Sequence, residues 1–424
     1  MPSQVTNDIE SNRTIVQSIN QFSFKLIKEF ASRHQDDSKN LCFSPFEVFN
    51  SLVMLLIGAK GVSEAQLEDM LCLCNFNYNH DIMVYGSSIY FDNRVQIMPT
   101  YLDRLREIFS IKPKRVDFSK PEQVIKVINK DAHELTDGAI DGVVNIKDII
   151  DDQNVRLVIT NAVFFRGYWL LKFGDVHKDD FFYSNGTKSS KVDMMSHVGK
   201  HRYVYCSDLK AQAVSIAYAA SEIRMVILLP DSKDSEAIYL VDLMSPERLN
   251  DLFKELQGRP KSPTELIIPR FALDAHKVSL QKSVKQMGAR SIYEHDMAQL
   301  TGICANDRIH LTKLVHKAFI LVDERGSFHS TNQSHEENSF MNEQTEPASN
   351  VTICFKANHP FMFIILDKDT GVICFMGILA DPKEILEVVH EKDLSRGMIH
   401  ELLNDIDNPT YSDNFSRCTS SSTA

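Results

Sequence analysis

The chemistry that this sequence indicates most clearly is cleavage by another enzyme, in a polar stretch near the C-terminus. A strand-like apolar run over residues 314–322 leads into Asp323, and residues 326–349 then carry few core-forming side chains. Phe340 and Met341 form the only adjacent pair of large apolar residues in that stretch. Because the first pocket of a cleft protease anchors one substrate side chain, the bond after Phe340 is a candidate cleavage site.

No pattern for catalysis or metal binding accompanies this stretch. The sequence has no phosphate-binding loop, no G-x-G-x-x-G, no H-E-x-x-H and no G-x-S-x-G. His133 and Glu134 lack the second histidine of a zinc protease, and His316 lies in an apolar run typical of a core histidine. Three potential ligands have no standard zinc spacing: Cys72, Cys74 and His80. We therefore expect no enzyme, no cofactor and no metal.

The composition is that of a large acidic globular protein. The 424 residues are 43% hydrophobic and carry a formal net charge of −11, with a pI near 5.8. This charge argues against general binding to nucleic acids or anionic membranes, so the basic cluster at 112–115 is interpreted as solvated surface. The longest apolar runs, such as 52–57 and 361–366, are too short to span a bilayer.

The N-terminus and the cysteines bear on the compartment. The first residues are polar and lack the apolar core of a signal peptide. Eight cysteines are scattered through the chain, which fits reduced thiols better than a disulfide framework. We expect a cytoplasmic protein, or an extracellular one exported without a cleaved signal peptide. Five sequons would matter only after secretion: Asn12, Asn185, Asn332, Asn350 and Asn414.

Helical signals dominate the first part of the chain. Apolar residues recur on one helical stripe over residues 14–31. Ser44 begins a capping box with proline at the first helical position, and Ser63 begins a second box. The apolar helix between them is expected to end at Gly58 and Gly61.

Strand signals dominate the later part. Residues 158–165 are apolar on both faces, as a central strand covered on both sides requires. Further strands are predicted at 225–231 and 264–271, and the runs 361–366 and 372–379 predict a hairpin. Early helices, late strands and an interleaved middle predict an α+β fold.

The chain is interpreted as one large domain with two appendages. No internal repeat or Pro/Gly-rich linker divides residues 14–382. Residues 1–13 form a polar N-terminal segment. Residues 383–424 form an atypical C-terminal extension, weakly amphipathic and then low in complexity, and we expect part of it to be disordered.

Five blocks in this order resemble the serpin family, and in particular its intracellular, ovalbumin-like members without a signal peptide. They are the Ser-Pro helix start at 44–47, the turn at 58–61, the N-A-x-x-F-x-G-x-W block at 161–169, and the segments 355–363 and 372–382. The resemblance implies helices packed on a large mixed main sheet, two smaller sheets, and an exposed reactive-centre loop at about 326–349. It also implies a monomer that is cut in this loop by a protease and distorts the acyl-enzyme as the loop inserts into the main sheet.

The family's inhibitory hinge is an acidic residue, any residue, glycine, threonine or serine, and then an alanine-rich run. Glu324, Arg325, Gly326 and Ser327 match its start, but residues 328–334 contain no alanine. The family's alternation implies that the inward-facing side chains on insertion are those of Ser327, His329, Thr331, Gln333 and His335. His329 and Gln333 would each cost roughly 1–3 kcal/mol if buried unsatisfied, which would slow insertion and let the protease escape.

The family's spacing leaves two candidates for the reactive bond. Counting forward from Glu324 gives the bond between Phe340 and Met341, whereas counting backward from residue 355 gives the bond near Ser349 and Asn350. We favour the first because Phe340 supplies an apolar anchor; the alternative is that both apolar side chains pack on the protein body.

Two functions remain open. No Lys or Arg occurs between positions 325 and 356, so the first hypothesis is an inhibitor of a chymotrypsin-like serine protease or a cysteine protease rather than of a trypsin-like enzyme. The second is a non-inhibitory serpin with a binding, storage or chaperone-like role, because the hinge lacks its small-residue run. Residues 72–88 contain no Lys or Arg, so activation by heparin through the family's usual helix is not expected.

Overall fold

The computed structural model describes residues 2–33, 40–73, 86–150, 154–185, 188–219, 221–233, 237–274, 278–327 and 351–382. Its helices are α1 (Pro2–Arg33), α2 (Pro45–Leu56), α3 (Gly61–Leu71), α4 (Pro99–Phe109), α5 (Pro121–Leu135), α6 (Ile146–Ile150), α7 (Tyr239–Leu243), α8 (Pro246–Gly258), α9 (Gln281–Gln286) and the 3-10 helix η1 (Ser291–Tyr293).

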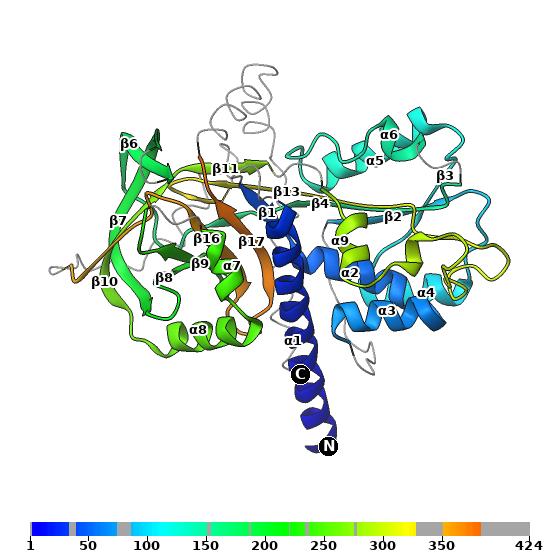
Figure 1. Cartoon of the computed structure of the whole chain (residues 1–424), viewed down its shortest axis with the longest axis horizontal. Helices are drawn as coiled ribbons and strands as arrows, with labels where there is room; N and C mark the ends of the chain where they lie inside the picture. The colour runs from blue at the N-terminus through cyan, green and yellow to red at the C-terminus, as the bar shows by residue number, and fades with distance from the viewer. Residues whose placement is uncertain are drawn as a thin grey trace.

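In the described part of the chain the main sheet has eight strands, of which two long ones lie at its centre. β4 (Leu157–Phe164) and β13 (Lys313–Val322) pair in parallel from Val158–Lys313 to Phe164–Phe319, and they run across the molecule in Figure 1. All of β4 except Phe164 is buried, which confirms the predicted central strand. The remaining strands are β2 (Ser87–Asp92), β3 (Lys114–Val116), β5 (Gly167–Tyr168), β11 (Phe271–Asp274), β12 (Val278–Ser279) and β14 (Gly326–Ser327).

The two smaller sheets implied by the resemblance are joined into one sheet of nine strands. The strand β7 (Lys188–Cys206) is long enough to belong to both halves. Its first part pairs with β6 (Asp175–Asn185) and β10 (Ser262–Pro269), and its last residues pair with β8 (Ala211–Ala217). The other strands are β1 (Leu41–Phe43), β9 (Ile223–Pro230), β15 (Ile353–Lys356), β16 (Phe361–Asp367) and β17 (Ile373–Leu379), and β16 and β17 form the predicted hairpin.

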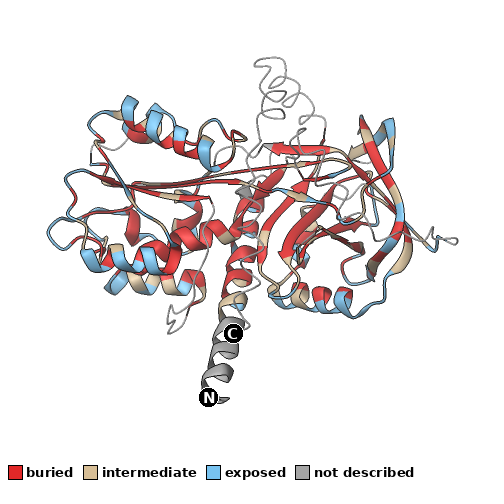
Figure 2. Ribbon diagram, turned by 180° about the vertical axis from the view of Figure 1, so that it is seen from behind, coloured by how far each residue is buried: buried red, intermediate tan, exposed pale blue. Residues whose placement is uncertain are grey.

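Two apolar cores hold these layers together. One core joins the helices α1 to α4 and α8 to both sheets, and the other joins the two sheets to each other and to α5. Figure 2 shows the strands that cross the molecule as mainly buried, while exposed positions gather on the outer faces of the helices. Helices packed on a mixed sheet confirm the predicted α+β class.

The helix starts differ from expectation in two places. The Ser44 side chain accepts a hydrogen bond from the Glu47 N–H as predicted, but the Ser44 N–H donates to His316, and the Glu47 carboxylate accepts a hydrogen bond from Ser87. The second capping box is wrong, because α3 begins at Gly61 and Ser63 lies inside it. Ser63 bonds to Ser291 and to the Gln299 N–H, so tertiary partners occupy its hydroxyl.

The first helix is longer than its apolar stripe. α1 begins at Pro2 rather than near residue 14, so the backbone of the predicted polar N-terminal segment is helical from Pro2 onward. Its stripe is buried as predicted at Ile19, Phe22, Leu26, Ile27 and Phe30. Among the described residues, no helix is long and apolar enough to cross a membrane.

Candidate functional site

Two residues of the predicted hinge, Gly326 and Ser327, form the short strand β14 in the main sheet, between β13 and β5. Val322 pairs with Ser327, while Gly326 and Ser327 pair with Tyr168 and Gly167, and both ladders are antiparallel. A tight turn reverses the chain after β13. The Asp323 carboxylate accepts from the N–H groups of residues 325 and 326, at 2.8 and 3.1 Å, and the Asp323 N–H donates to the Gly326 carbonyl at 2.9 Å.

Ser327 is the last residue described before the polar loop, and its side chain faces inward. It is fully buried, and its hydroxyl bonds to that of Tyr218 at 2.8 Å. Tyr218 stacks on Trp169 with ring centroids 4.4 Å apart, and burial raises the pKa of its phenol. Ser327 is thus buried in this structure, with a neutral hydroxyl partner, whereas its orientation on insertion stays a prediction.

The backbone of the turn is held by the segment after β5. Trp169 donates its amide N–H to the Arg325 carbonyl at 2.8 Å and its indole N–H to the Asp323 carbonyl at 2.9 Å. Phe173 donates its amide N–H to the Glu324 carbonyl at 2.9 Å. The single tryptophan thus binds two of the carbonyls that precede the loop.

The Glu324 side chain forms an ion pair with Arg270. Arg270 lies 2.7 Å from the Glu324 carboxylate and 3.2 Å from that of Asp193. Since all three side chains are about one-third exposed, solvent screens the triad and its contribution to stability is small. The neighbouring Arg325 is exposed.

A buried polar cluster crosses the middle of the β4–β13 ladder, where Asn161 pairs in register with His316. The Asn161 amide donates to the hydroxyls of Ser51 and Ser87, each at 2.7 Å. The Nε2 atom of His316 accepts from the Ser44 N–H at 3.1 Å, and its Nδ1 atom has no hydrogen-bond partner among the described residues. The sequence interpretation of a satisfied core histidine is therefore half right.

The other candidate chemistry identified from the sequence forms no centre. Within the described ranges no three His, Cys, Asp or Glu side chains gather in a way that could hold a metal ion. Cys72 is a free thiol, while Cys74 and His80 lie outside those ranges. In the basic cluster, Lys114 pairs with Asp131 at 2.5 Å and Arg115 bonds to two backbone carbonyls, so both have local structural partners.

The arrangement matches a known family. A family model described as serpin (serine protease inhibitor) matches residues 17–382. This chain belongs to the serpin family. It is similar to a leukocyte elastase inhibitor of Xenopus laevis, with 26% identity over 381 residues covering 85% of this chain and 97% of that one. It is also similar to an uncharacterized serpin-like protein of Thermococcus kodakarensis, with 28% identity over 397 residues covering 88% of this chain and 87% of the other.

A solved structure supports the fold. The crystal structure of uncleaved ovalbumin has a TM-score of 0.73 and 22% identity, covering 87% of this chain and all of that one. At this identity the likeness shows the serpin fold alone. Membership in a family of protease inhibitors also fits the expectation that this serpin is not an enzyme, at the level of the family.

Part of the predicted site lies outside the described residues. The favoured bond at Phe340 and Met341 is there, as is the alternative at Ser349 and Asn350. The remaining hinge positions are also there: His329, Thr331, Gln333 and His335. So are three of the sequons, at Asn332, Asn350 and Asn414, whereas Asn12 and Asn185 lie in α1 and β6 without described side chains.

Sequence reasoning missed the groups that hydrogen-bond to residues 323–327. They are the Tyr218 hydroxyl, the Asp323 carboxylate and the two N–H groups of Trp169. Asp323 carried a detectable signal, because an aspartate followed by a glycine three positions later is typical of a turn closed by its own side chain. Tyr218 carried none, since only the tertiary fold brings it to Ser327.

Gly326 is the position at which this site should be most sensitive. A Cβ atom there would lie 2.1 Å from the Gly167 carbonyl oxygen and 2.7 Å from the Tyr168 Cα, and backbone atoms cannot swing aside. Gly326→Ala should expel β14, shift Trp169 fluorescence to longer wavelength and lower the free energy of unfolding by roughly 1–3 kcal/mol. Gly174→Ala is the control, because its added Cβ meets nothing within 4 Å. Wild-type emission and stability in Gly326→Ala would contradict this account of the hinge.

Proposed function

We propose that this serpin inhibits a chymotrypsin-like serine protease or a cysteine protease as a suicide substrate, with the reactive bond between Phe340 and Met341. One observation carries the proposal. Gly326 and Ser327 are already paired as the first residues of a strand between β13 and β5, with Ser327 buried.

The direction of that strand supports insertion of the cut loop. β13 and β4 are parallel, so a chain that reverses after β13 is antiparallel to both. Residues after Ser327 would therefore continue between β13 and β4 with no change of topology once the β4–β13 ladder opens. The ladder is closed from Val158–Lys313 to Phe164–Phe319, so no strand lies between β4 and β13 over these residues.

The alternative, a non-inhibitory binding, storage or chaperone-like serpin, is favoured by the loop sequence. His329 and Gln333 follow Ser327 at alternate positions, so both would face inward if the loop continued as a strand from the buried Ser327. Opening the ladder also disrupts the cluster of Asn161 and His316. If insertion is slower than hydrolysis of the acyl-enzyme, the protease cuts the loop and leaves.

The thiols bear on where this serpin works. Cys354 is a free thiol on the surface. An exposed free thiol suits a reducing compartment, so a cytoplasmic location is the one we favour over export without a cleaved signal.

A protease panel tests the function and the bond together. With chymotrypsin, a cathepsin and trypsin, we expect a complex that survives boiling in detergent with one of the first two, and a released fragment that begins at Met341. Phe340→Ala should slow cleavage by about a hundredfold or more, since it removes the apolar anchor. Phe328→Ala, which removes the loop's other phenylalanine, is the control.

The outcomes separate the hypotheses. Clean cleavage at every protease ratio, with no high-mass band, would support the non-inhibitory alternative. A fragment that begins at Asn350 would move the reactive bond to the second candidate position.

A further inference from the structure

A cationic pocket opens on the nine-stranded sheet beyond the C-terminal end of α8. It has a volume of about 350 Å³ and is lined by residues of β7, β8 and β9, the end of α8 and the turn between β16 and β17. This volume lies at the lower end of the range for small-molecule sites. In a protein with a net charge of −11, its wall holds five cationic side chains and one carboxylate: Lys200, Arg202, Arg224, Lys261, Lys368 and Asp369.

Three of these cations are uncompensated. Lys368 forms an ion pair with Glu222, and Arg224 lies 3.8 Å from the same carboxylate. Lys200, Arg202 and Lys261 form no ion pair within the described part of the chain. The Nε–H of Arg202 is buried and has no hydrogen-bond partner there. A buried, unsatisfied guanidinium N–H is unfavourable unless a further acceptor reaches it.

The cations also act on one another. Burial lowers the pKa of Arg224; Glu222 opposes that shift, and the charge of Arg202 adds to it. Burial lowers the pKa of His201 as well, and Lys261 contributes in the same direction. His201 is therefore neutral at physiological pH, and the positive charge of the pocket comes from arginine and lysine. An anion in this pocket would relieve the repulsion.

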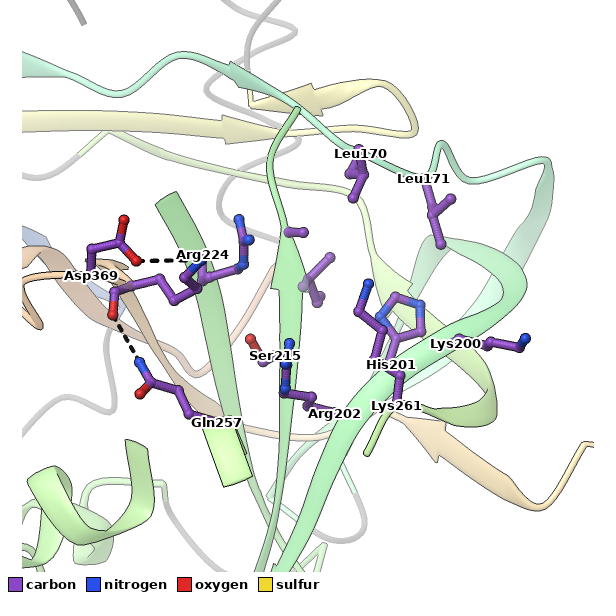
Figure 3. A pocket seen from close by; sticks show the side chains of 13 residues that line it. Leu170, Leu171, Lys200, His201, Arg202, Ser215, Arg224, Gln257, Lys261 and Asp369 are labelled. Atoms are coloured by element: carbon purple, nitrogen blue, oxygen red, sulfur yellow. Dashed lines mark hydrogen bonds and ion pairs between the residues drawn. The ribbon is translucent and has the colours of Figure 1, made fainter. Parts of the chain in front are cut away.

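Apolar side chains complete the wall. Figure 3 shows Leu170 and Leu171 at one end of the pocket, Arg224 and Asp369 to one side, and Lys200, His201 and Lys261 to the other. Leu170 is 38% exposed, so an apolar group in the pocket could reach its side chain. An inorganic ion would satisfy the cations but would leave these leucines in water.

We propose that this pocket binds a small organic anion, with its charged group held by Arg202 and the surrounding lysines and its apolar body against Leu170 and Leu171. Anion binding here does not depend on whether the serpin inhibits a protease, because neither Gly326 nor Ser327, the two described residues of β14, lines the pocket.

The probe is 8-anilinonaphthalene-1-sulfonate, and its uncharged analogue N-phenyl-1-naphthylamine differs only by the missing sulfonate. Fluorescence titration of the full chain should give saturable binding of one sulfonate dye per protein. The uncharged dye should bind at least tenfold more weakly. Added salt should weaken the sulfonate dye much more than the uncharged one, because screening acts on charge.

Variants locate the binding to the pocket. Arg202→Gln and, separately, Lys261→Gln should each weaken the sulfonate dye by about tenfold. Lys254→Gln removes an exposed cation from α8 outside the pocket and should bind like the wild type. Lys261 is exposed, so its variant tests the proposal even if Arg202→Gln fails to fold. Equal affinity for both dyes, or wild-type affinity in folded Arg202→Gln and Lys261→Gln, would overturn the proposal.

Discussion

Cleavage of the loop after Phe340 should raise the melting temperature of this serpin by about 10 °C or more. The cut loop would replace one parallel ladder, between β4 and β13, with two antiparallel ladders. On the order of ten additional backbone hydrogen bonds at about 1 kcal/mol each give that rise for a chain of this size. The measurement is a pair of melting curves, before and after nicking with a protease that is then removed.

The hinge substitutions test what limits this gain. His329→Ala/Gln333→Ala removes the two bulky polar side chains at inward positions, so the nicked variant should gain more in melting temperature than the nicked wild type. It should also need fewer inhibitor molecules per protease inactivated. Asn332→Ala/Ser334→Ala, at the alternate positions, is the matched control and should behave like the wild type. If nicking raises the melting temperature of the wild type as much as that of His329→Ala/Gln333→Ala, the polar hinge does not limit insertion.

The elements of this fold that could be predicted from sequence are those whose pattern is set by local burial. β4 was found because both faces of residues 158–165 are apolar, and α1 was found because its stripe has a helical period. The second capping box failed because the Ser63 hydroxyl bonds to Ser291, a residue far away in the chain. A hydroxyl at the right spacing cannot tell a local partner from a tertiary one.

In the candidate site, too, the residues with a local sequence pattern were predicted, and those brought in by the tertiary fold were not. Glu324 to Ser327 were found because the segment between β13 and the polar loop has a family pattern. The groups that bind them were not found, because Tyr218 and Trp169 lie just after β8 and β5, more than 100 residues away in the chain. The polar cluster under the ladder was also missed, although Asn161 in an otherwise apolar strand is the kind of residue that needs buried partners.

His316 makes this serpin sensitive to acid. Burial lowers the pKa of its imidazole from 6.5 to about 3, and its Nε2 atom faces the Ser44 N–H, so a proton added there would remove that hydrogen bond. Above pH 6.5 both the folded and the unfolded imidazole are neutral. Between pH 6.5 and about 3 the unfolded chain takes up a proton that the folded chain does not, so the free energy of unfolding falls as the pH falls.

Between pH 7.5 and pH 5, His316 alone should lower the free energy of unfolding by roughly 2 kcal/mol. The lower pH is 1.5 units below 6.5, and each unit corresponds to about 1.36 kcal/mol. His197 and His201, whose Nε2 atoms lie 2.7 Å apart, are also held neutral by burial and add to the loss in the same direction. His316→Gln keeps an acceptor for Ser44 without a titrating group, so urea unfolding should show about 2 kcal/mol less acid destabilisation than in the wild type. Equal pH dependence in His316→Gln and the wild type would mean that His316 is protonated in the folded serpin, and that the β4–β13 ladder admits water at its centre.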